Sequence, residues 1–594
     1  MTPFACRFCF YAAAWLAASA AAWAQSDPAA VIPCAPWPLT DALGRSAPAP
    51  EEAGPPQPGR FVGIFYFVWQ EHADVKRPDV NSPYDVAKIL AQDPDALKKP
   101  ASPLWGPIGT YHYWAEPLFG YYRPTDPWVL RRHAHLLADA GIDVLILDAT
   151  NALTYRHAYE RLCGVFEEVR SEGGRTPRIA FMLNSDAGKT AAKLFADLYQ
   201  PGLHRDLWFL WQGKPLLLCE SAQASPEVRG FFTLRRAHWP FEMVNTPFAW
   251  HWEAAYPQPY GYTDDPGKPE QVNVSVAQNL RAADGKVTNM SHLDARGRSF
   301  HDGRPDVSPG AVDRGLNFQE QWKRAFDLAP PFVMVTGWNE WIAGRWGNAG
   351  GPIIFVDQYD QEYSRDIEPV RGGHGDNYYC QLVANIRKYK GVGPLPKASA
   401  PRTLAVEGGF EAWADVAPEY RDHAGETIPR DHDGVAGSHY ADRSARNDLD
   451  VLKVSRDGKS LYFYARTREP LSPREGGSWM WLLIDADRSP ATGWEGFEWI
   501  VNRTLETDGS TWLEKSAGPG WSWTKAERIP CRGAGKELQL AIPRKALGLP
   551  EDAAKVSIDF KWADGIQRPG DILDFYSSGD VAPEGRMRYR YSAE

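Results

Sequence analysis

The stretch Asp143-Val144-Leu145-Ile146-Leu147-Asp148 decides the fold, because it reads as a strand that is apolar on both faces and ends on a carboxylate. Strands buried on both faces are typical of parallel sheets covered by helices. Similar runs recur at 61–68, 178–183, 215–219, 244–252, 272–277 and 332–336. Helical patterns alternate with them at about 127–140, 155–171, 188–198, 226–237, 314–328 and 376–390. This alternation predicts an α/β fold, a (β/α)8 TIM-type barrel over 58–390.

The hydrophobic period changes after residues 391–403, a Gly- and Pro-rich segment that we interpret as a linker. Short strand patterns follow at 451–454, 461–466, 479–484, 498–502, 537–542, 556–562 and 572–576. Asp-Gly turns separate several of them, as at Asp457-Gly458. The region 404–594 is therefore predicted to form an antiparallel β-sandwich.

The N-terminal 24 residues are typical of a secretory signal peptide. Arg7 supplies a positive charge, residues 8–23 are mainly apolar, and Ala22-Trp23-Ala24 fits a cleavage site. The apolar run is shorter than the roughly 20 residues of a membrane span, although an uncleaved anchor remains the alternative. A Pro- and Ala-rich leader, 25–57, follows. We expect a secreted or periplasmic protein with no membrane span after cleavage.

Composition excludes several other classes. The formal net charge is −10 and there is no long basic run, so a nucleic-acid partner is not expected. The chain has neither a GxGxxG nor a GxxxxGK turn, which argues against nucleotide binding. Five cysteines remain beyond the signal, without a CxxC pair. Neither a disulfide framework nor a cysteine zinc site is expected, and one disulfide stays open.

Four carboxylates follow predicted barrel strands, where catalytic residues of such barrels stand: Asp148, Glu220, Glu253 and Glu340. No GxSxG or HExxH motif accompanies them, and the chain is rich in aromatic residues, with 25 Trp. Carboxylates among aromatic side chains favour glycoside hydrolysis, for which no cofactor is required. The alternatives are that Asp148 caps a helix, that Glu220 pairs with a basic residue, and that Glu253 is a rim residue.

The segment Thr336-Gly337-Trp338-Asn339-Glu340-Trp341 resembles the strand-end signature of glycoside hydrolase family 99, the endo-α-mannosidases and mannanases. Tyr111-His112-Tyr113-Trp114 and Trp250-His251-Trp252 also resemble that family. The resemblance implies that Glu340 is catalytic. It also gives our candidate substrate-binding residues: Tyr111, His112, Trp114, Trp250, His251, Trp252, Trp338, Asn339 and Trp341.

The resemblance fails at one position. The family has a second catalytic Glu three residues after the first, and this chain has Ala343 there. One alternative is that another strand-end carboxylate supplies the acid/base, with Glu253 favoured over Glu220. The others are that the reaction differs, or that the barrel binds a glycan without cleaving it. The polar and aromatic segments 356–366 and 372–379 are expected to form a rim loop.

Residues 404–594 resemble carbohydrate-binding module family 9, through 479–487 and 492–498. That family clamps a terminal sugar between two Trp rings, which makes Trp479, Trp494 and Trp499 candidate sugar-binding residues here. Alternation in Trp479-Met480-Trp481 puts the two Trp on one face. Asp485 and Asp487 could bind a structural Ca²⁺, since hard oxygen ligands cluster there, and a turn held by Asx bonds is the alternative.

The sequence therefore predicts a secreted glycoside hydrolase that acts on a polysaccharide or glycan, with an appended carbohydrate-binding domain. A non-catalytic glycan-binding protein on the same scaffold is the main alternative, and a structural envelope protein is the third.

Overall fold

The computed structural model describes residues 31–78, 80, 82–242, 244–348, 350–551 and 555–593. The predicted signal peptide, 1–24, lies outside the described residues. Within the described part of the chain, no helix is both long and apolar enough to cross a membrane. The five described cysteines, Cys34, Cys163, Cys219, Cys380 and Cys531, are buried and free.

The N-terminal half is built on a nearly closed sheet of parallel strands, as predicted. Going round the sheet, the strands follow chain order from β1 to β8, and β9 and β14 complete the path back to β1. Their side chains are mostly buried on both faces. The parallel strands are β1 (Phe61–Tyr66), β3 (Val144–Ala149), β4 (Arg178–Leu183), β6 (Lys214–Leu218), β7 (Thr233–His238), β8 (Ala249–His251), β9 (Gln271–Ser275) and β14 (Phe332–Thr336).

A side chain bridges the seam between β8 and β9. Gln271 accepts a hydrogen bond from the His251 amide at 2.9 Å and donates one to the His251 carbonyl at 2.9 Å. One buried amide thus satisfies both backbone groups that a neighbouring strand would otherwise pair. This closure brings Glu253, just after β8, round to the side where β14 ends.

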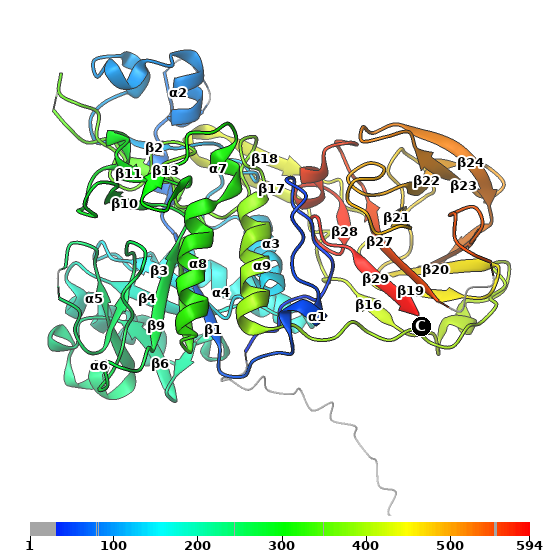
Figure 1. Cartoon of the computed structure of the whole chain (residues 1–594), viewed down its shortest axis with the longest axis horizontal. Helices are drawn as coiled ribbons and strands as arrows, with labels where there is room; N and C mark the ends of the chain where they lie inside the picture. Colours follow the sequence, from blue (N-terminus) through cyan, green and yellow to red (C-terminus); the bar gives the residue numbers. More distant parts are fainter. Residues whose placement is uncertain are drawn as a thin grey trace, which may run out of the picture.

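Five longer helices cover the sheet (Figure 1), close to the predicted ranges: α3 (Pro127–Ala140), α4 (Arg156–Ser171), α5 (Ala187–Leu194), α8 (Leu316–Leu328) and α9 (Asn377–Lys390). The helix predicted at 226–237 is wrong over its second half. Only α6 (Pro226–Phe231) is helical, and β7 follows at once. Gly230 and the β-branched Thr233 weaken helix propensity there, and the side chains of β7 pack into the barrel.

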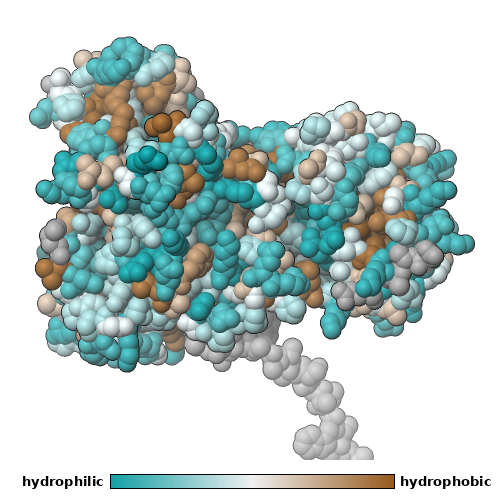
Figure 2. All heavy atoms as spheres, in the orientation of Figure 1, coloured by the Kyte–Doolittle hydropathy of each residue, from teal (hydrophilic) through white to brown (hydrophobic). Residues whose placement is uncertain are grey.

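An arm formed by residues 70–110 stands beside the barrel and carries α2 (Val86–Gln92) (Figure 1). Apolar side chains gather there on a face that is otherwise largely hydrophilic (Figure 2). Trp105 and Ile89 pack with Phe355 and Ala343 of the barrel in one buried cluster. The short strands β2 (Tyr111–Tyr113) and β15 (Ile342–Gly344) pair beside it, so the arm borders the segment that follows Glu340.

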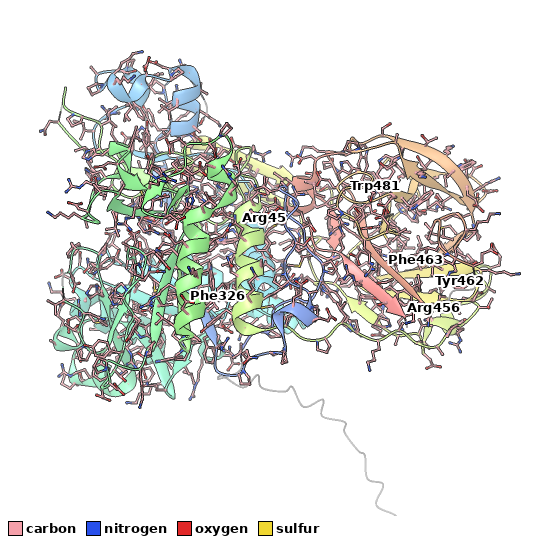
Figure 3. The ribbon with its side chains drawn as sticks, in the orientation of Figure 1. Arg45, Phe326, Arg456, Tyr462, Phe463 and Trp481 are labelled. Atoms are coloured by element: carbon pink, nitrogen blue, oxygen red, sulfur yellow. The ribbon has the colours of Figure 1, made fainter. Side chains whose placement is uncertain are left out.

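The C-terminal half consists mainly of two antiparallel sheets that share one apolar cluster, an arrangement consistent with the predicted sandwich. Phe463, labelled in Figure 3, lies in that shared layer. The first sheet contains β16 (Glu419–Arg421), β19 (Leu449–Arg456), β20 (Ser460–Thr467), β25 (Cys531–Ala534) and β26 (Glu537–Pro543). The second contains β21 (Trp481–Asp485), β22 (Trp499–Leu505), β23 (Thr511–Ser516), β24 (Trp523–Ile529), β27 (Val556–Asp564), β28 (Asp580–Ala582) and β29 (Tyr589–Ala593). The strand predicted at 572–576 is wrong, because Ile572–Tyr576 is a 3₁₀ helix capped by the Asp571 side chain.

The two halves are joined by buried ion pairs as well as by the chain. Arg430, on the hairpin β17 (Arg430–Asp433) and β18 (His439–Asp442), contacts Asp126 at the start of α3 at 2.8 Å. Arg586 contacts Asp376, before α9, at 2.7 Å. The described part of the leader also runs between the halves (Figure 1), where Trp37 packs on Tyr589 with ring centroids 4.8 Å apart. The leader therefore contributes to the contact between the two halves.

Candidate functional site

The ends of two parallel strands place Asp148 and Glu340 in one cleft. Asp148 is the penultimate residue of β3, and Glu340 follows β14 by four residues. Since both strands run in the same direction, both side chains reach the same edge of the sheet. The cleft there has a volume of about 400 Å³, and both carboxylates line it.

One arginine holds the carboxylates together. The Arg365 guanidinium is fully buried and contacts Glu340 through Nε at 3.2 Å and Nη2 at 3.1 Å. Its Nη1 contacts Glu253 at 3.2 Å, and its Nη2 also contacts Asp357 at 3.2 Å. One cation thus faces three carboxylates, which leaves the group with excess negative charge when all are ionised.

Glu340 and Asp357 are the pair that a substrate could reach. Both line the cleft, and the Asp357 side chain is 43% exposed. Glu340 Oε1 and Asp357 Oδ1 both accept from Arg365 Nη2. The distance between these two oxygens therefore cannot exceed the sum of the two hydrogen-bond distances. Burial raises the pKa of Glu340 well above its usual range, and the Arg365 charge opposes that shift. Both Glu340 oxygens accept from the guanidinium, a contact that favours the ionised form.

Glu253 lies behind this pair. Its side chain is fully buried, with Oε1 accepting from the Asn279 amide at 3.0 Å and Oε2 facing Arg365. Burial raises the pKa of Glu253 to about 7, against the opposing charge of Arg365. It is not among the residues that line the cleft within the described chain. Glu253 is therefore placed to fix Arg365 rather than to meet a substrate.

Asp148 is held from two sides. Its Oδ2 accepts a hydrogen bond from Trp69 Nε1 at 2.7 Å, and its Oδ1 accepts from the Thr150 amide at 2.9 Å. Burial raises the pKa of Asp148. It does not cap the following helix, because α4 begins after Tyr155. A buried, oriented carboxylate at a cleft wall suits the binding of hydroxyl groups.

The cleft walls are largely aromatic. Trp252 lies under the Arg365 guanidinium, which is 4.7 Å from its ring centroid, and Trp69 and Tyr111 form the opposite side with Asp148. Two rim residues leave large apolar surfaces in solvent: Phe241 is 66% exposed and Trp346 is 47% exposed. Apolar walls with a few polar groups are typical of small-ligand pockets.

Several sequence-predicted residues lie elsewhere. Glu220 caps a short 3₁₀ helix through the Ala222 amide and lies 3.7 Å from Arg236, which fits the alternative of a pair with a basic residue. It is absent from the cleft lining among described residues. Trp250 packs on Phe332 at the opposite end of the barrel and donates to Glu270. His251 contacts Asn245 at 3.2 Å.

The remaining predicted binding residues form the support of the site. Trp114 stacks on Trp341 with ring centroids 5.2 Å apart, and Trp338 packs on His133. Asn339 accepts from the Phe67 amide at 2.9 Å and so ties the end of β14 to β1. His112 is buried between Tyr84 and Phe355. Of the nine predicted contacts, Tyr111 and Trp252 line the cleft.

The predicted sugar-binding tryptophans of the C-terminal half are buried. Trp479, Trp494 and Trp499 are 1%, 3% and 7% exposed. The prediction that Trp479 and Trp481 share a face is also wrong, because they belong to different apolar clusters. Met480 between them has φ 45°, which interrupts the strand alternation. Trp521 and Trp523 are partly exposed instead.

The predicted calcium ligands sit in a hydrogen-bonded turn. Asp485 contacts Arg588 at 2.6 Å, and Asp487 accepts from the Ser489 amide at 2.9 Å and from Thr492. Glu498 lies close enough to both to share an ion with them. These contacts fit the Asx-turn alternative, and calcium binding here stays a prediction.

The sequence reasoning missed Arg365 and Asp357 as site residues. Both lie in the 356–366 segment, which was expected only to form a rim loop. The available signal was four acidic residues and an arginine, together with two tyrosines, shortly after the Glu340 strand.

No protein-family model matches the chain, and a search of curated proteins finds no match. Two solved structures of the glycoside hydrolase family 99 endo-α-mannosidase from Bacteroides thetaiotaomicron are similar to part of it. The one in complex with bis-tris-propane is 11% identical, with a TM-score of 0.33, and covers 55% of this chain and 96% of that chain. The other is 14% identical, with a TM-score of 0.32, and covers 55% and 97%.

Proposed function

We propose that this chain is a glycoside hydrolase that acts on a polysaccharide or glycan, with Glu340 and Asp357 as its catalytic carboxylates. The observation that carries the proposal is that both contact Arg365 Nη2, at 3.1 Å and 3.2 Å, at the wall of an aromatic cleft. Added together, these two distances set an upper limit on the separation of the contacting Glu340 and Asp357 oxygens. That limit is below the roughly 6.5–9.5 Å that separates the carboxyl groups of inverting enzymes. The spacing therefore favours retention of configuration.

The two carboxylates differ in a way that suggests their roles. Both Glu340 oxygens accept from Arg365, so we assign Glu340 as the nucleophile, whose carboxylate attacks the anomeric carbon and forms a glycosyl ester. Asp357 is reached by solvent, so it protonates the leaving oxygen. The resulting Asp357 carboxylate then takes a proton from water, whose oxygen attacks the anomeric carbon, breaks its bond to Glu340 and releases the Glu340 carboxylate.

The other cleft groups fit substrate binding. Asp148 and the amides of Asn151 and Asn184 line the cleft and offer hydrogen bonds to sugar hydroxyls. Trp346 and Phe241, which are both exposed, offer aromatic faces to the apolar side of a sugar ring. Similar placement of a few polar groups between apolar walls fixes ligand orientation in other pockets.

The direct test is the anomeric configuration of the first product, followed by proton NMR on a polysaccharide that the protein cleaves. We expect the anomer of the substrate to be retained. Inversion would contradict the Glu340–Asp357 pair. A screen for reducing-end release across polysaccharides supplies the substrate.

A non-catalytic glycan-binding protein is the second candidate. The observation that favours it is Ala343, which lines the cleft at the position where the resembling family has its second catalytic Glu. Binding to a polysaccharide without any reducing-end release would support this candidate.

We extend the proposal to the rest of the chain. The signal-like residues 1–24 support export to the periplasm or the medium. The partly exposed Trp521 and Trp523, with ring centroids 5.3 Å apart, are the better candidates for a sugar contact in the C-terminal half.

A further inference from the structure

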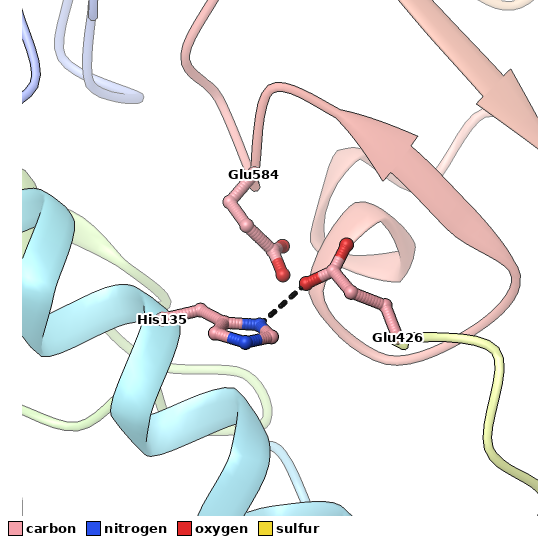
Figure 4. A group of neighbouring side chains, drawn as sticks. All are labelled: His135, Glu426 and Glu584. Atoms are coloured by element: carbon pink, nitrogen blue, oxygen red, sulfur yellow. Dashed lines mark hydrogen bonds and ion pairs between the residues drawn. The ribbon is translucent and has the colours of Figure 1, made fainter. Parts of the chain in front are cut away.

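A buried carboxylate cluster lies where α3 of the barrel meets the C-terminal sheets. Glu426 and Glu584 come from the C-terminal half and point toward His135 of α3 (Figure 4). Asp422 follows β16, and Asp580 begins β28. Glu426, Asp580 and Glu584 are 1%, 0% and 2% exposed. Carboxylates are rarely buried this completely unless they are paired or bind a metal.

Each carboxylate in this cluster has an oxygen without a hydrogen-bond partner among the described residues: Asp422 Oδ2, Glu426 Oε2, Asp580 Oδ1 and Glu584 Oε2. Their other contacts are well formed, since Glu426 Oε1 contacts His135 Nδ1 at 2.6 Å and Asp580 Oδ2 accepts from the Leu449 amide at 2.6 Å. A buried acceptor without a partner is costly. The unpartnered oxygens therefore point to a ligand.

The charges of the cluster do not balance. Arg132 contacts Glu584 at 2.9 Å and Glu426 at 3.3 Å, and the buried Lys561 faces the same carboxylates. Nearby, His423 pairs with Asp139, and Asp448 pairs with Arg468. The four carboxylates, when ionised, exceed the two cations by two charges. One divalent cation would neutralise the difference.

We propose that Asp422, Glu426 and Asp580 bind a divalent cation, Ca²⁺, that fastens the C-terminal sheets to α3. One oxygen from each residue lies within 4.8 Å of the others. Calcium–oxygen distances of about 2.3–2.6 Å allow two ligands on one ion to be about that far apart at most. Glu584 belongs to a neighbouring group, with one oxygen within 4.8 Å of Glu426 and His135 ligand atoms.

The donor atoms favour calcium over zinc. The unpartnered atoms of the four carboxylates are all oxygens, the ligands that Ca²⁺ prefers. His135 Nδ1 already contacts Glu426 Oε1, so it orients the carboxylate from behind, as residues around metal ligands commonly do. Arg132 does the same for Glu584. A zinc ion on His135 Nδ1 would have to displace the contact with Glu426.

Shared protons are the competing explanation. Burial raises the pKa of Asp580 to about 8 and that of Glu426 well above its usual range, and each faces another carboxyl at hydrogen-bond range. Protonated carboxyls could thus satisfy one another without a cation. The two explanations differ in their response to calcium.

The test uses the full chain, freed of metal with EGTA and then titrated with CaCl₂ at pH 7.5. We expect about one Ca²⁺ per chain by elemental analysis after dialysis. We also expect the thermal unfolding midpoint to rise with calcium, since an ion that binds only the folded state stabilises it. Calcium bound nowhere, with an unchanged midpoint, would overturn the proposal. So would stabilisation by ZnCl₂ and not by CaCl₂.

Matched variants locate the ion. Asp580→Asn keeps an acceptor for the Leu449 amide and deletes the charge, so it should abolish the calcium-dependent shift. Asp487→Asn, in the hydrogen-bonded acidic turn, should keep both the shift and the bound ion. The opposite pattern would place calcium in the turn and refute this site. If Asp580→Asn does not fold, Glu426→Gln, which keeps size and an oxygen for the contact with His135, should weaken calcium binding, and unchanged binding would count against the site.

Discussion

Arg365 donates two hydrogen bonds to Glu340, from Nε to Oε2 at 3.2 Å and from Nη2 to Oε1 at 3.1 Å. Both side chains are buried. Bidentate arginine–carboxylate pairs are among the stronger hydrogen-bonded contacts and fix the orientation of the carboxylate. The Glu340 carboxylate is thereby fixed in orientation at the wall of the cleft. The arginine also limits how far Asp357 can move from it, since Nη2 is shared.

Asp357→Asn should lower turnover by about 10²–10⁴-fold, because general acid–base help of that size is lost. The fold should survive, since the Asp357 side chain is 43% exposed. Glu220→Gln is the matched control, with a side chain that is 39% exposed and lies beside an arginine outside the cleft lining. Rates and unfolding midpoints of both variants are the measurement. Equal losses in the two variants would refute the role of Asp357.

Arg365→Met should destabilise the protein by up to about 3–5 kcal/mol, since removing one partner of a buried ion pair leaves charges uncompensated. Without the arginine, the buried carboxylates become neutral by taking up protons more readily at low pH. The loss of unfolding free energy, measured with urea, should therefore be smaller at pH 5 than at pH 8. Arg371→Met, at a pair in which the arginine side chain is 42% exposed, should cost about 0–1 kcal/mol. A loss at Arg365 that does not depend on pH would indicate packing instead.

Asp366→Asn should flatten the pH dependence of stability. Burial raises the pKa of Asp366 from 3.8 to about 7. Between these values the folded protein holds a proton that the unfolded chain has released, so the free energy of unfolding falls as pH rises. The wild-type midpoint should therefore decline relative to the variant between about pH 4 and about pH 7. Parallel curves for the two proteins would contradict the raised pKa.

Trp346→Ala should raise KM severalfold and leave kcat nearly unchanged, because an exposed rim ring contributes to binding the substrate and its transition state equally. Phe248→Ala is the control, since Phe248 is 44% exposed and lies outside the cleft lining among described residues. Steady-state kinetics on a cleaved glycan give both constants. A fall in kcat alone would argue against a sugar platform.

The barrel could be predicted from the sequence because its strands are apolar on both faces. Asp148 closes such a run, so both its strand and its edge follow from the pattern. The region after α6 could not be predicted in the same way. Thr233–His238 carries two adjacent arginines, Arg235 and Arg236, after a helix start, and only packing in the barrel decides in favour of the strand.

The site was predictable only in part, for a related reason. Glu340 stands at a strand end, whereas Asp357 and Arg365 lie in a loop without a hydrophobic period, whose path depends on the arm and on β15. Trp250 was predicted to bind substrate and does not line the cleft among the described residues. It lies two residues before Trp252, which lines the cleft, but its own ring packs against Phe332. Aromatic content alone does not distinguish a sugar platform from a packed ring.

The most direct test of the account is reducing-end release from a cleaved polysaccharide by the wild-type protein and by Glu340→Gln. The substitution keeps size and removes the ionisable group, so we expect activity to fall by at least about 10²–10⁴-fold, with the fold retained by circular dichroism. Full turnover by Glu340→Gln on that substrate would make Glu340 structural and contradict the proposed mechanism.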